Sequence, residues 1–204
     1  MKSFIHRNLI ILFIACGCVS YASAQDAKKP LTGSELLALV AGNALSENVA
    51  HEIDSRGLAF PLNDAYRSQL TAAGADAHVL AALGKAKTAG PSANGATASS
   101  PELLQHLSAA GKFIRAEQYD KAAQELDNAL KSGDGPGAGL VMGELLKVQE
   151  QWPMAASVYE KVLQENPDFP EAHTKLSYLM YRLGNQETRT PRGQSRFGAD
   201  TGQR

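Results

Sequence analysis

Residues 119–130 read YDKAAQELDNAL, and residues 152–163, thirty-three positions further on, read WPMAASVYEKVL. The two stretches align without a gap, and an aromatic, a small and a large apolar residue recur at the same places. The matched pairs are Tyr119 and Trp152, Ala122 and Ala155, Leu126 and Tyr159, Ala129 and Val162, and Leu130 and Leu163. This spacing places the apolar side chains on one face of a helix. A repeat of this length predicts stacked helix pairs.

Each of these helices is predicted to be the second of a pair. From Pro101 onward the apolar residues keep helical spacing, and turns are expected near Glu117 and Gln151. Gly143 and Ala110 supply a small residue in the first helix of each pair, where a neighbouring helix approaches closely. This combination resembles the tetratricopeptide repeat (TPR) family. The resemblance implies an all-α fold in which residues 101–184 form a TPR-like α-solenoid of about two and a half repeats.

A third unit begins but is not completed. Pro170 is expected to open a helix, Leu176 matches the large apolar position of the TPR pattern, and Gly184 with Asn185 matches its usual turn. No second helix can be read in the polar run that follows, so residues 185–204 are predicted to be a disordered tail. The last helix would then expose an apolar face unless the N-terminal module, another chain or further repeats cover it.

Residues 34–87 predict four short helices, which form an N-terminal module in front of the array. Gly57 is expected to end the second helix, and Phe60 to pack between two helical hairpins. The expected N-caps are Ser34, Ser46, Asn63 or Asp64, and Asp76. Leu36, Val40, Val49 and Ile53 recur thirty positions later as Tyr66, Leu70, Val79 and Leu83. This echo predicts one hairpin written twice, although chance similarity in an alanine-rich segment is the alternative.

The same segment resembles a small helical module of exported bacterial proteins, in which a hairpin, a Gly-x-x-Phe connection and a second hairpin recur. That resemblance implies no activity. Residues 88–100 are small and polar and predict a flexible linker, after which Ser100 is expected to cap the next helix. The residues that carry the resemblance are Leu39, Val40, Val49, Ile53, Gly57, Phe60, Leu70, Ala73, Gly74, Val79 and Leu83.

Residues 1–24 have the pattern of a signal peptide. Lys2 and Arg7 precede a short apolar run, and small residues ending at Ala24 predict cleavage before Gln25. The run is too short to cross a bilayer as an anchor. A lipoprotein signal at Cys16 is the alternative. Either route exports the chain, so a periplasmic or secreted location is expected, with no integral membrane segment after cleavage.

Composition excludes several classes of function. The formal net charge is −1, and removal of residues 1–24 takes away two basic residues and no acidic one. Such a balance predicts no binding to nucleic acid. Cys16 and Cys18 both lie in the predicted signal peptide, so the mature chain would contain no disulfide, thiol nucleophile or cysteine metal ligand.

No catalytic motif is complete. His51 and Glu52 begin a metalloprotease motif, but position 55, where a second histidine is needed, is Ser55. The other histidines are not paired at metal-ligand spacing. Asp120 and Glu125 lie on a helix face that is normally solvated and are not expected to act as an acid/base pair. The sequence predicts a protein that is not an enzyme and that has no cofactor and no metal.

Stacked helix pairs present a concave surface, made from the first helix of each pair, that can recognise a peptide or a helix of another protein. By the TPR resemblance, groove positions fall on Leu104, Leu107, Ile114, Arg115, Leu140, Glu144, Lys147, Val148, Glu171, Thr174, Tyr178, Tyr181 and Arg182. The candidate partner-binding residues among them are Ile114, Arg115, Glu144, Lys147, Tyr178, Tyr181 and Arg182. Aromatic rings and a guanidinium provide large contact areas and directional donors. The alternative for Tyr178 and Tyr181 is that they cover a following repeat.

The function that the sequence predicts is that of an exported, non-catalytic adaptor or scaffold that binds a protein or peptide. Two alternatives remain open. The chain could be an N-terminal fragment or accessory region of a larger envelope protein. It could also be a weak binder of cell-wall polysaccharide, a class that needs exposed aromatic residues.

Overall fold

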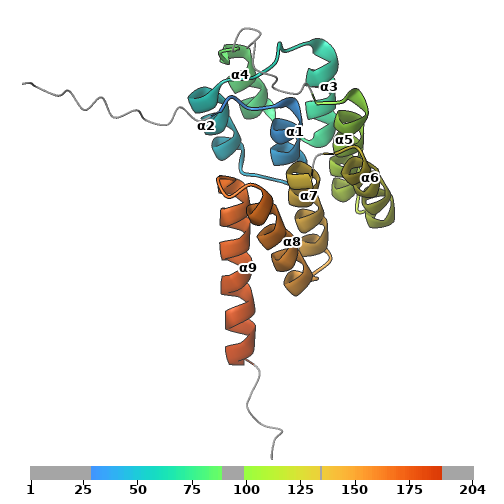
Figure 1. Ribbon diagram of the computed structural model, residues 1–204, viewed down its shortest axis with the longest axis vertical. Coiled ribbons are helices and arrows are strands. Elements are labelled where there is room, and N and C mark those ends of the chain that lie inside the picture. Colours follow the sequence, from blue (N-terminus) through green and yellow to red (C-terminus); the bar gives the residue numbers. More distant parts are fainter. Residues whose placement is uncertain (1–28, 89–98, 134, 190–204) are drawn as a thin grey trace, which may run out of the picture.

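The computed structural model describes residues 29–88, 99–133 and 135–189 (Figure 1). The predicted signal peptide, residues 89–98 of the predicted linker and residues 190–204 lie outside them. The described residues form nine α-helices, which confirms the predicted all-α fold for this part of the chain. The helices are α1 (Gly33–Ala41), α2 (Ser46–Arg56), α3 (Asp64–Ala73), α4 (Ala77–Lys85), α5 (Pro101–Arg115), α6 (Tyr119–Lys131), α7 (Gly135–Val148), α8 (Trp152–Glu165) and α9 (Pro170–Arg189).

Side-chain caps begin several helices where the sequence placed them. The side chains of Asn63, Asp76 and Ser100 accept hydrogen bonds from backbone N–H groups in the first turns of α3, α4 and α5. The predicted caps Ser34 and Ser46 were wrong. Thr32 caps α1, because its extended backbone aims the hydroxyl at the N–H of the third helical residue.

Ser46 is the first residue of α2, and its hydroxyl serves a tertiary contact instead of a cap. It donates a hydrogen bond of 2.6 Å to Oδ2 of Asp76, the N-cap of α4. Asp76 therefore joins the starts of α2 and α4. The hydrogen bonds that its carboxylate accepts from Ser46 and from the Val79 N–H keep the pKa of Asp76 below its usual value. Ser46 and Asp76 are thirty residues apart, which is the offset of the apolar echo.

Equivalent helices of the two N-terminal units pack against each other. The main contacts are between α1 and α3 and between α2 and α4, rather than within hairpins. The predicted echo therefore marks a real structural repeat, but its helices pair across the units. All eight echoing side chains are buried, as expected for the inner faces of such a pair: Leu36, Val40, Val49, Ile53, Tyr66, Leu70, Val79 and Leu83.

Extended connections hold the N-terminal helices together. Leu58 forms isolated β-bridges with Leu31 and with Thr88, and its side chain is fully buried. Gly57 permits this approach, because its φ is +68° and a Cβ there would lie 2.6 Å from the Lys87 carbonyl oxygen. Phe60, which was predicted to pack between the hairpins, is partly buried against the core. Its ring packs edge-on against Tyr66 of α3, with ring centroids 4.8 Å apart.

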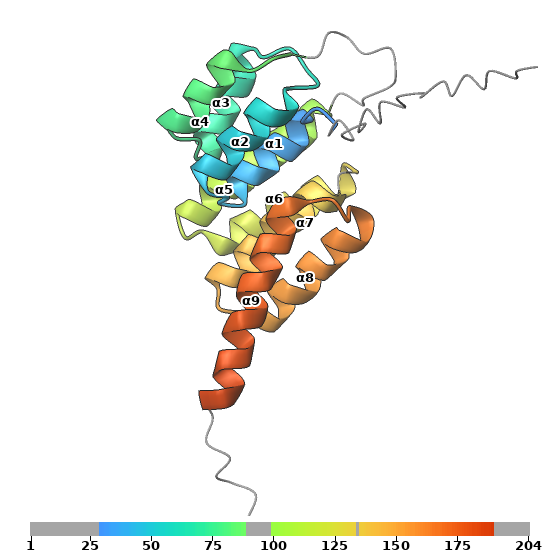
Figure 2. The same cartoon turned by 90° about the vertical axis from the view of Figure 1, so that its left-hand side faces the viewer.

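The remaining helices form the predicted pairs. α5 packs on α6 and α7 on α8, while α6 contacts α7 and α8 contacts α9 (Figure 2). Gly143 leaves no room for a Cβ against the Tyr159 ring, which explains the small residue predicted there. The predicted end of the array at residue 184 was too early. α9 continues through Gly184 and Asn185 to Arg189, so these two residues do not form the expected turn.

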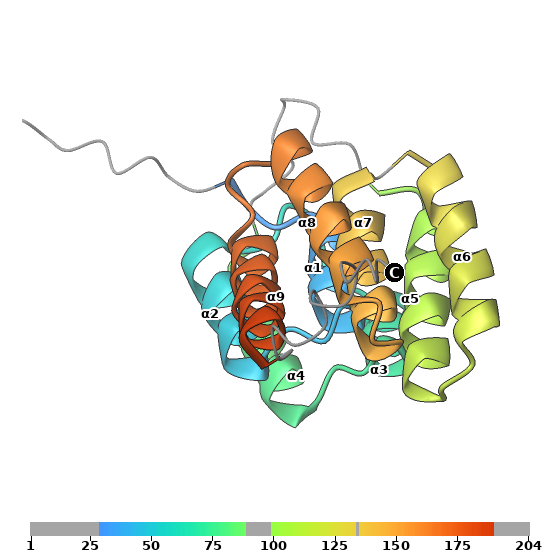
Figure 3. The same cartoon turned by 90° about the horizontal axis from the view of Figure 1, so that it is seen from below.

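The N-terminal module and the helix pairs share one hydrophobic core. α1 contacts α5 and α7, and α3 contacts α5. α1 lies at the centre of the molecule, with α2 and α9 on one side and α5 on the other (Figure 3). The ends of the predicted linker are part of this packing, since Ser99 Oγ accepts a hydrogen bond of 2.9 Å from the Ser34 N–H.

Candidate functional site

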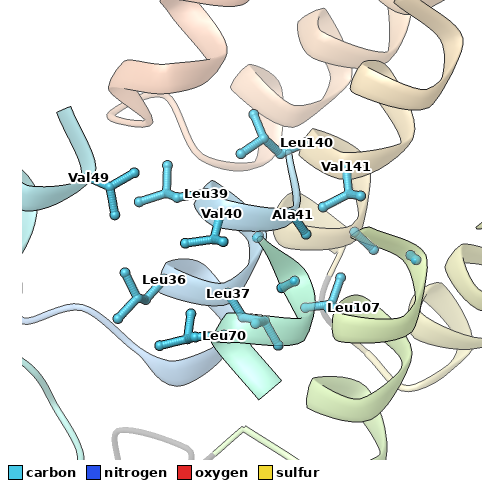
Figure 4. Packing of buried hydrophobic residues seen from close by; sticks show 14 of the residues in the cluster. Leu36, Leu37, Leu39, Val40, Ala41, Val49, Leu70, Leu107, Leu140 and Val141 are labelled. Carbon is cyan, nitrogen blue, oxygen red and sulfur yellow. The ribbon is translucent and has the colours of Figure 1, made fainter. Parts of the chain in front are cut away.

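Helix α1 fills the concave face on which a partner was expected. Every α1 residue except Glu35 is buried. A Cβ on Gly111 of α5 would lie 2.8 Å from Cβ of Ala41, so the two backbones are in close contact. Figure 4 shows Leu107, Leu140 and Val141 gathered beside Leu37 and Ala41 of α1. The groove that the first helices of the pairs would offer to another protein is occupied by this chain's own helix.

The predicted groove residues of α5 therefore make contacts within the molecule. Ile114 is buried, and Leu107 is fully buried. Arg115 Nη2 donates a hydrogen bond of 2.6 Å to the carbonyl oxygen of Ala72 at the end of α3. Partial burial lowers the pKa of Arg115 from its ordinary value. Arg115 thus helps to hold the N-terminal module, and Ile114 is part of the hydrophobic core.

A cluster of polar and charged residues, the Glu144 cluster, joins α7 and α9 to the loop between α1 and α2, and its Glu144, Glu171 and Lys175 are buried. It consists of Asn43, Glu144, Lys147, Glu171 and Lys175. Oε2 of Glu144 lies 2.8 Å from Lys147 Nζ and 3.1 Å from Lys175 Nζ. Lys175 also donates a hydrogen bond of 3.3 Å to the Asn43 carbonyl oxygen. Glu144 is 1% exposed, so neither it nor its partner Lys175 is free to bind another protein in this arrangement.

Tyr159 lies next to this cluster. Its ring is fully buried, and no described residue forms a hydrogen bond with its hydroxyl. Burial raises the pKa of this hydroxyl, and the neighbouring Glu144 and Glu171 carboxylates raise it further. Tyr66 is the opposite case, because its buried hydroxyl donates a hydrogen bond of 2.6 Å to the Gly33 carbonyl oxygen.

These two tyrosines should respond differently to loss of the hydroxyl. Tyr66→Phe is expected to lower the free energy of unfolding by about 1–2 kcal/mol, because the buried hydrogen bond to the Gly33 carbonyl is lost. Tyr159→Phe is expected to change it by less than about 0.5 kcal/mol or to raise it, because a buried unpaired hydroxyl is removed. Urea denaturation of both variants measures the difference, and equal losses would contradict the assigned hydrogen bonding.

The aromatic residues of α9 remain on the surface. Tyr178 is 50% and Tyr181 70% exposed, whereas Leu179 between them is buried against the core. The Arg182 guanidinium lies 4.5 Å from the ring centroid of Trp152 and 6.0 Å from that of Tyr178. Such cation–π stacking orients an arginine that would otherwise sample many rotamers. Of the seven candidate residues, these three on α9 are the ones that the structure brings together on an open surface.

Sequence reasoning missed the role of Trp152. Its position in the repeat indicated a packing residue, and the ring also carries Arg182. The thirty-residue separation of the two gives no local signal, because they meet only through the packing of α8 on α9.

Other candidate chemistry is dispersed. Glu125 Oε2 lies 2.7 Å from His106 Nδ1, so this carboxylate pairs with a histidine and not with Asp120. The described residues contain no group of three or more histidine, cysteine or acidic side chains that could hold a metal ion. Within the same residues, no helix has the length and apolar character needed to cross a membrane.

The chain was compared with known proteins in three ways. No family model, no curated protein and no solved structure matches it. Inference about function therefore rests on the residues and their geometry.

Proposed function

We propose that this chain is an exported, non-catalytic adaptor that binds a peptide or helix of another protein along the outer face of α9. The observation that carries the proposal is the contrast between two surfaces. The concave face is filled by α1, while Tyr178, Tyr181 and Arg182 stand together on the open side of α9.

The chemistry of this surface supports protein recognition. Exposed tyrosine rings supply contact area with little loss of side-chain entropy on binding, and arginine adds directional donors. Stacking on Trp152 holds Arg182 in place before a partner arrives, which lowers the entropic cost of the complex. We further propose that the helix pairs α5–α6 and α7–α8 are TPR units, supported by the thirty-three-residue repeat and by the contact of Gly143 with Tyr159.

Export is part of the same proposal. Its support is the charged, apolar and small-residue pattern of residues 1–24, with cleavage before Gln25 and a lipoprotein signal at Cys16 as the alternative. A partner would then be met in the periplasm or outside the cell.

The test is affinity capture from an envelope fraction by the mature chain. Tyr181→Ala combined with Arg182→Ala is expected to lower the recovery of a stoichiometric partner by about tenfold or more, which corresponds to about 1.4 kcal/mol of binding free energy. Leu130→Ala, at an exposed apolar residue of α6, is the matched control and should leave recovery unchanged. If the Tyr181→Ala and Arg182→Ala double variant recovers the partner as well as the Leu130→Ala control does, the binding site lies elsewhere. If the double variant instead loses binding to purified cell wall, polysaccharide recognition is favoured.

One observation favours the second candidate, an accessory region of a larger envelope protein. In the α7–α8 pair, Tyr159 of α8 covers Gly143 of α7. The residue of α9 that corresponds to Gly143 is Ser177, thirty-four positions further on. Ser177 and the nearby Met180 are exposed, so this face of α9 is open to a further helix. Longer relatives that continue the repeats beyond α9 would support this candidate.

A further inference from the structure

A cavity of about 310 Å³ lies where the N-terminal module meets the start of α9. Its apolar wall includes Leu39 of α1, Val49 of α2 and Phe169, which immediately precedes α9, and all three are buried in the core. Figures 1 and 3 show the start of α9 close to α2, with α1 beside them. This volume lies at the lower end of the range for ligand sites, and it has room for one long side chain.

The polar wall of the cavity is acidic. Glu35, Glu52 and Glu171 line it, and Arg56 is its one arginine or lysine. Arg56 is already engaged, since its guanidinium binds both Glu35 oxygens at 2.6 and 2.9 Å and donates from Nε to the Lys29 carbonyl oxygen at 2.7 Å. Arg56 is therefore shared between Glu35 of α1 and Glu52 of α2, and it forms no ion pair with Glu171.

Glu171 is the carboxylate with the weakest support. It is 7% exposed, and its Oε1 lies 3.4 Å from Lys175 Nζ. Lys175 donates its hydrogen bonds to Glu144 and to the Asn43 carbonyl instead. The contact of Glu171 with Lys175 is therefore an ion pair within α9, made to a cation that Glu144 shares. A donor entering the cavity would add a hydrogen bond to this buried carboxylate.

We infer that this cavity binds the side chain of a lysine or arginine from a partner segment. The ammonium or guanidinium group donates to Glu171, and the methylene stem packs on Leu39, Val49 and Phe169. Thr174 also lines the cavity, and Tyr178 and Tyr181 follow it four and seven positions on, along one face of α9. The bound segment therefore continues from the cavity onto the tyrosines. This inference rests on the proposed function, because it assigns the chemistry of the segment that the α9 face binds.

The experiment uses NMR titration of the ¹⁵N-labelled mature chain with three acetylated hexapeptides. Their sequence is serine, glycine, X, leucine, leucine and serine, where X is arginine, citrulline or glutamate. The arginine peptide is expected to give saturable shifts at the amides of Asn48, His51 and Thr174. Citrulline has the same shape without the charge, so its peptide is expected to bind about tenfold more weakly, and the glutamate peptide is expected not to bind.

Two variants locate the binding. Glu171→Gln is expected to weaken the arginine peptide about tenfold, while Glu160→Gln, at an exposed acid of α8, should leave its affinity unchanged. Ala44→Leu fills the cavity without altering charge and is expected to weaken binding as well, which keeps the test valid if Glu171→Gln disturbs folding.

Equal affinity for the arginine and citrulline peptides, shifts confined to another surface, or the absence of saturable shifts would overturn the inference. The adaptor function fails separately. A captured partner that depends on Tyr181 and Arg182 but not on Glu171 would keep the adaptor function and remove the basic anchor. If the arginine peptide binds in the cavity but recovery of the partner does not depend on Tyr181 and Arg182, the basic anchor stands and the adaptor function at the α9 face is overturned.

Discussion

Lys175→Met is expected to lower the free energy of unfolding by about 3–5 kcal/mol, because it leaves buried carboxylates without their shared cation. The Lys175 side chain is 8% exposed and lies 3.1 Å from Glu144 and 3.4 Å from Glu171. Methionine keeps most of the side-chain volume, so the loss reports charge and hydrogen bonding rather than a cavity. Urea denaturation of the mature chain measures it.

A second substitution identifies the cause. Adding Glu171→Gln to Lys175→Met is expected to restore a large part of the loss, because Glu144 keeps Lys147 at 2.8 Å and the other carboxylate is gone. Lys161→Met, at an exposed lysine of α8, is the control and should change stability by less than about 0.5 kcal/mol. A Lys175→Met variant as stable as this control would show that the charge cluster is open to water.

Gly111→Ala is expected to lower the free energy of unfolding by about 1–3 kcal/mol, although alanine is the better helix former. The added Cβ would lie 2.8 Å from Cβ of Ala41, 3.0 Å from its Cα and 3.2 Å from the Ala73 carbonyl oxygen. Two of these neighbours are backbone atoms, so they can move only if α1 or the end of α3 shifts away from α5. The same denaturation experiment measures the change.

Gly84→Ala is the matched control for this variant. Gly84 is also inside a helix, but a Cβ there would have no neighbour within 4 Å. Its replacement is expected to raise stability by about 0.5–1 kcal/mol through helix propensity alone. If the two variants changed stability in the same direction, the close contact of α1 with α5 would be wrong.

The sequence predicted local structure well because the relevant signals are local. The aromatic and small residues around Tyr159 and Gly143 repeat at the spacing of a helix pair, and the structure places those two residues in contact. Asn63, Asp76 and Ser100 precede apolar residues at helical spacing, and each caps a helix. The all-α fold follows from the same periodicity.

The sequence did not predict what covers the concave face. Periodicity shows which side chains are apolar, but Leu107 and Leu140 look the same whether a partner or another part of the chain buries them. The one available signal was α1, whose residues 36–41 read LLALVA and leave no polar face. A helix that is apolar all round is expected to be buried on all sides, and α1 obtains this burial by entering the groove.

The candidate binding residues fall into two groups, those on the face that α1 covers and those on the exposed face of α9. Ile114, Arg115, Glu144 and Lys147 were chosen by their places on the first helices of a TPR-like groove. Arg115 binds the end of α3, Ile114 is buried in the core, and Glu144 and Lys147 belong to the Glu144 cluster. Tyr178 and Tyr181 lie beyond the reach of α1 and remain exposed. Long-range pairs such as Glu144 with Lys175 cannot be read from spacing, because the fold alone brings them together.

Nuclear Overhauser effects in the unmodified mature chain test directly whether α1 lies in the concave face of the helix pairs. Strong cross-peaks are expected between the Ala41 methyl group and the α-protons of Gly111, because a Cβ on Gly111 would lie only 2.8 Å from Cβ of Ala41. Cross-peaks are also expected between the α-protons of Gly42 and the methyl groups of Leu140, because a Cβ on Gly42 would lie 3.4 Å from Leu140 Cδ2. If all four residues are assigned and these cross-peaks are missing, α1 does not lie against α5 and α7 and the groove is open.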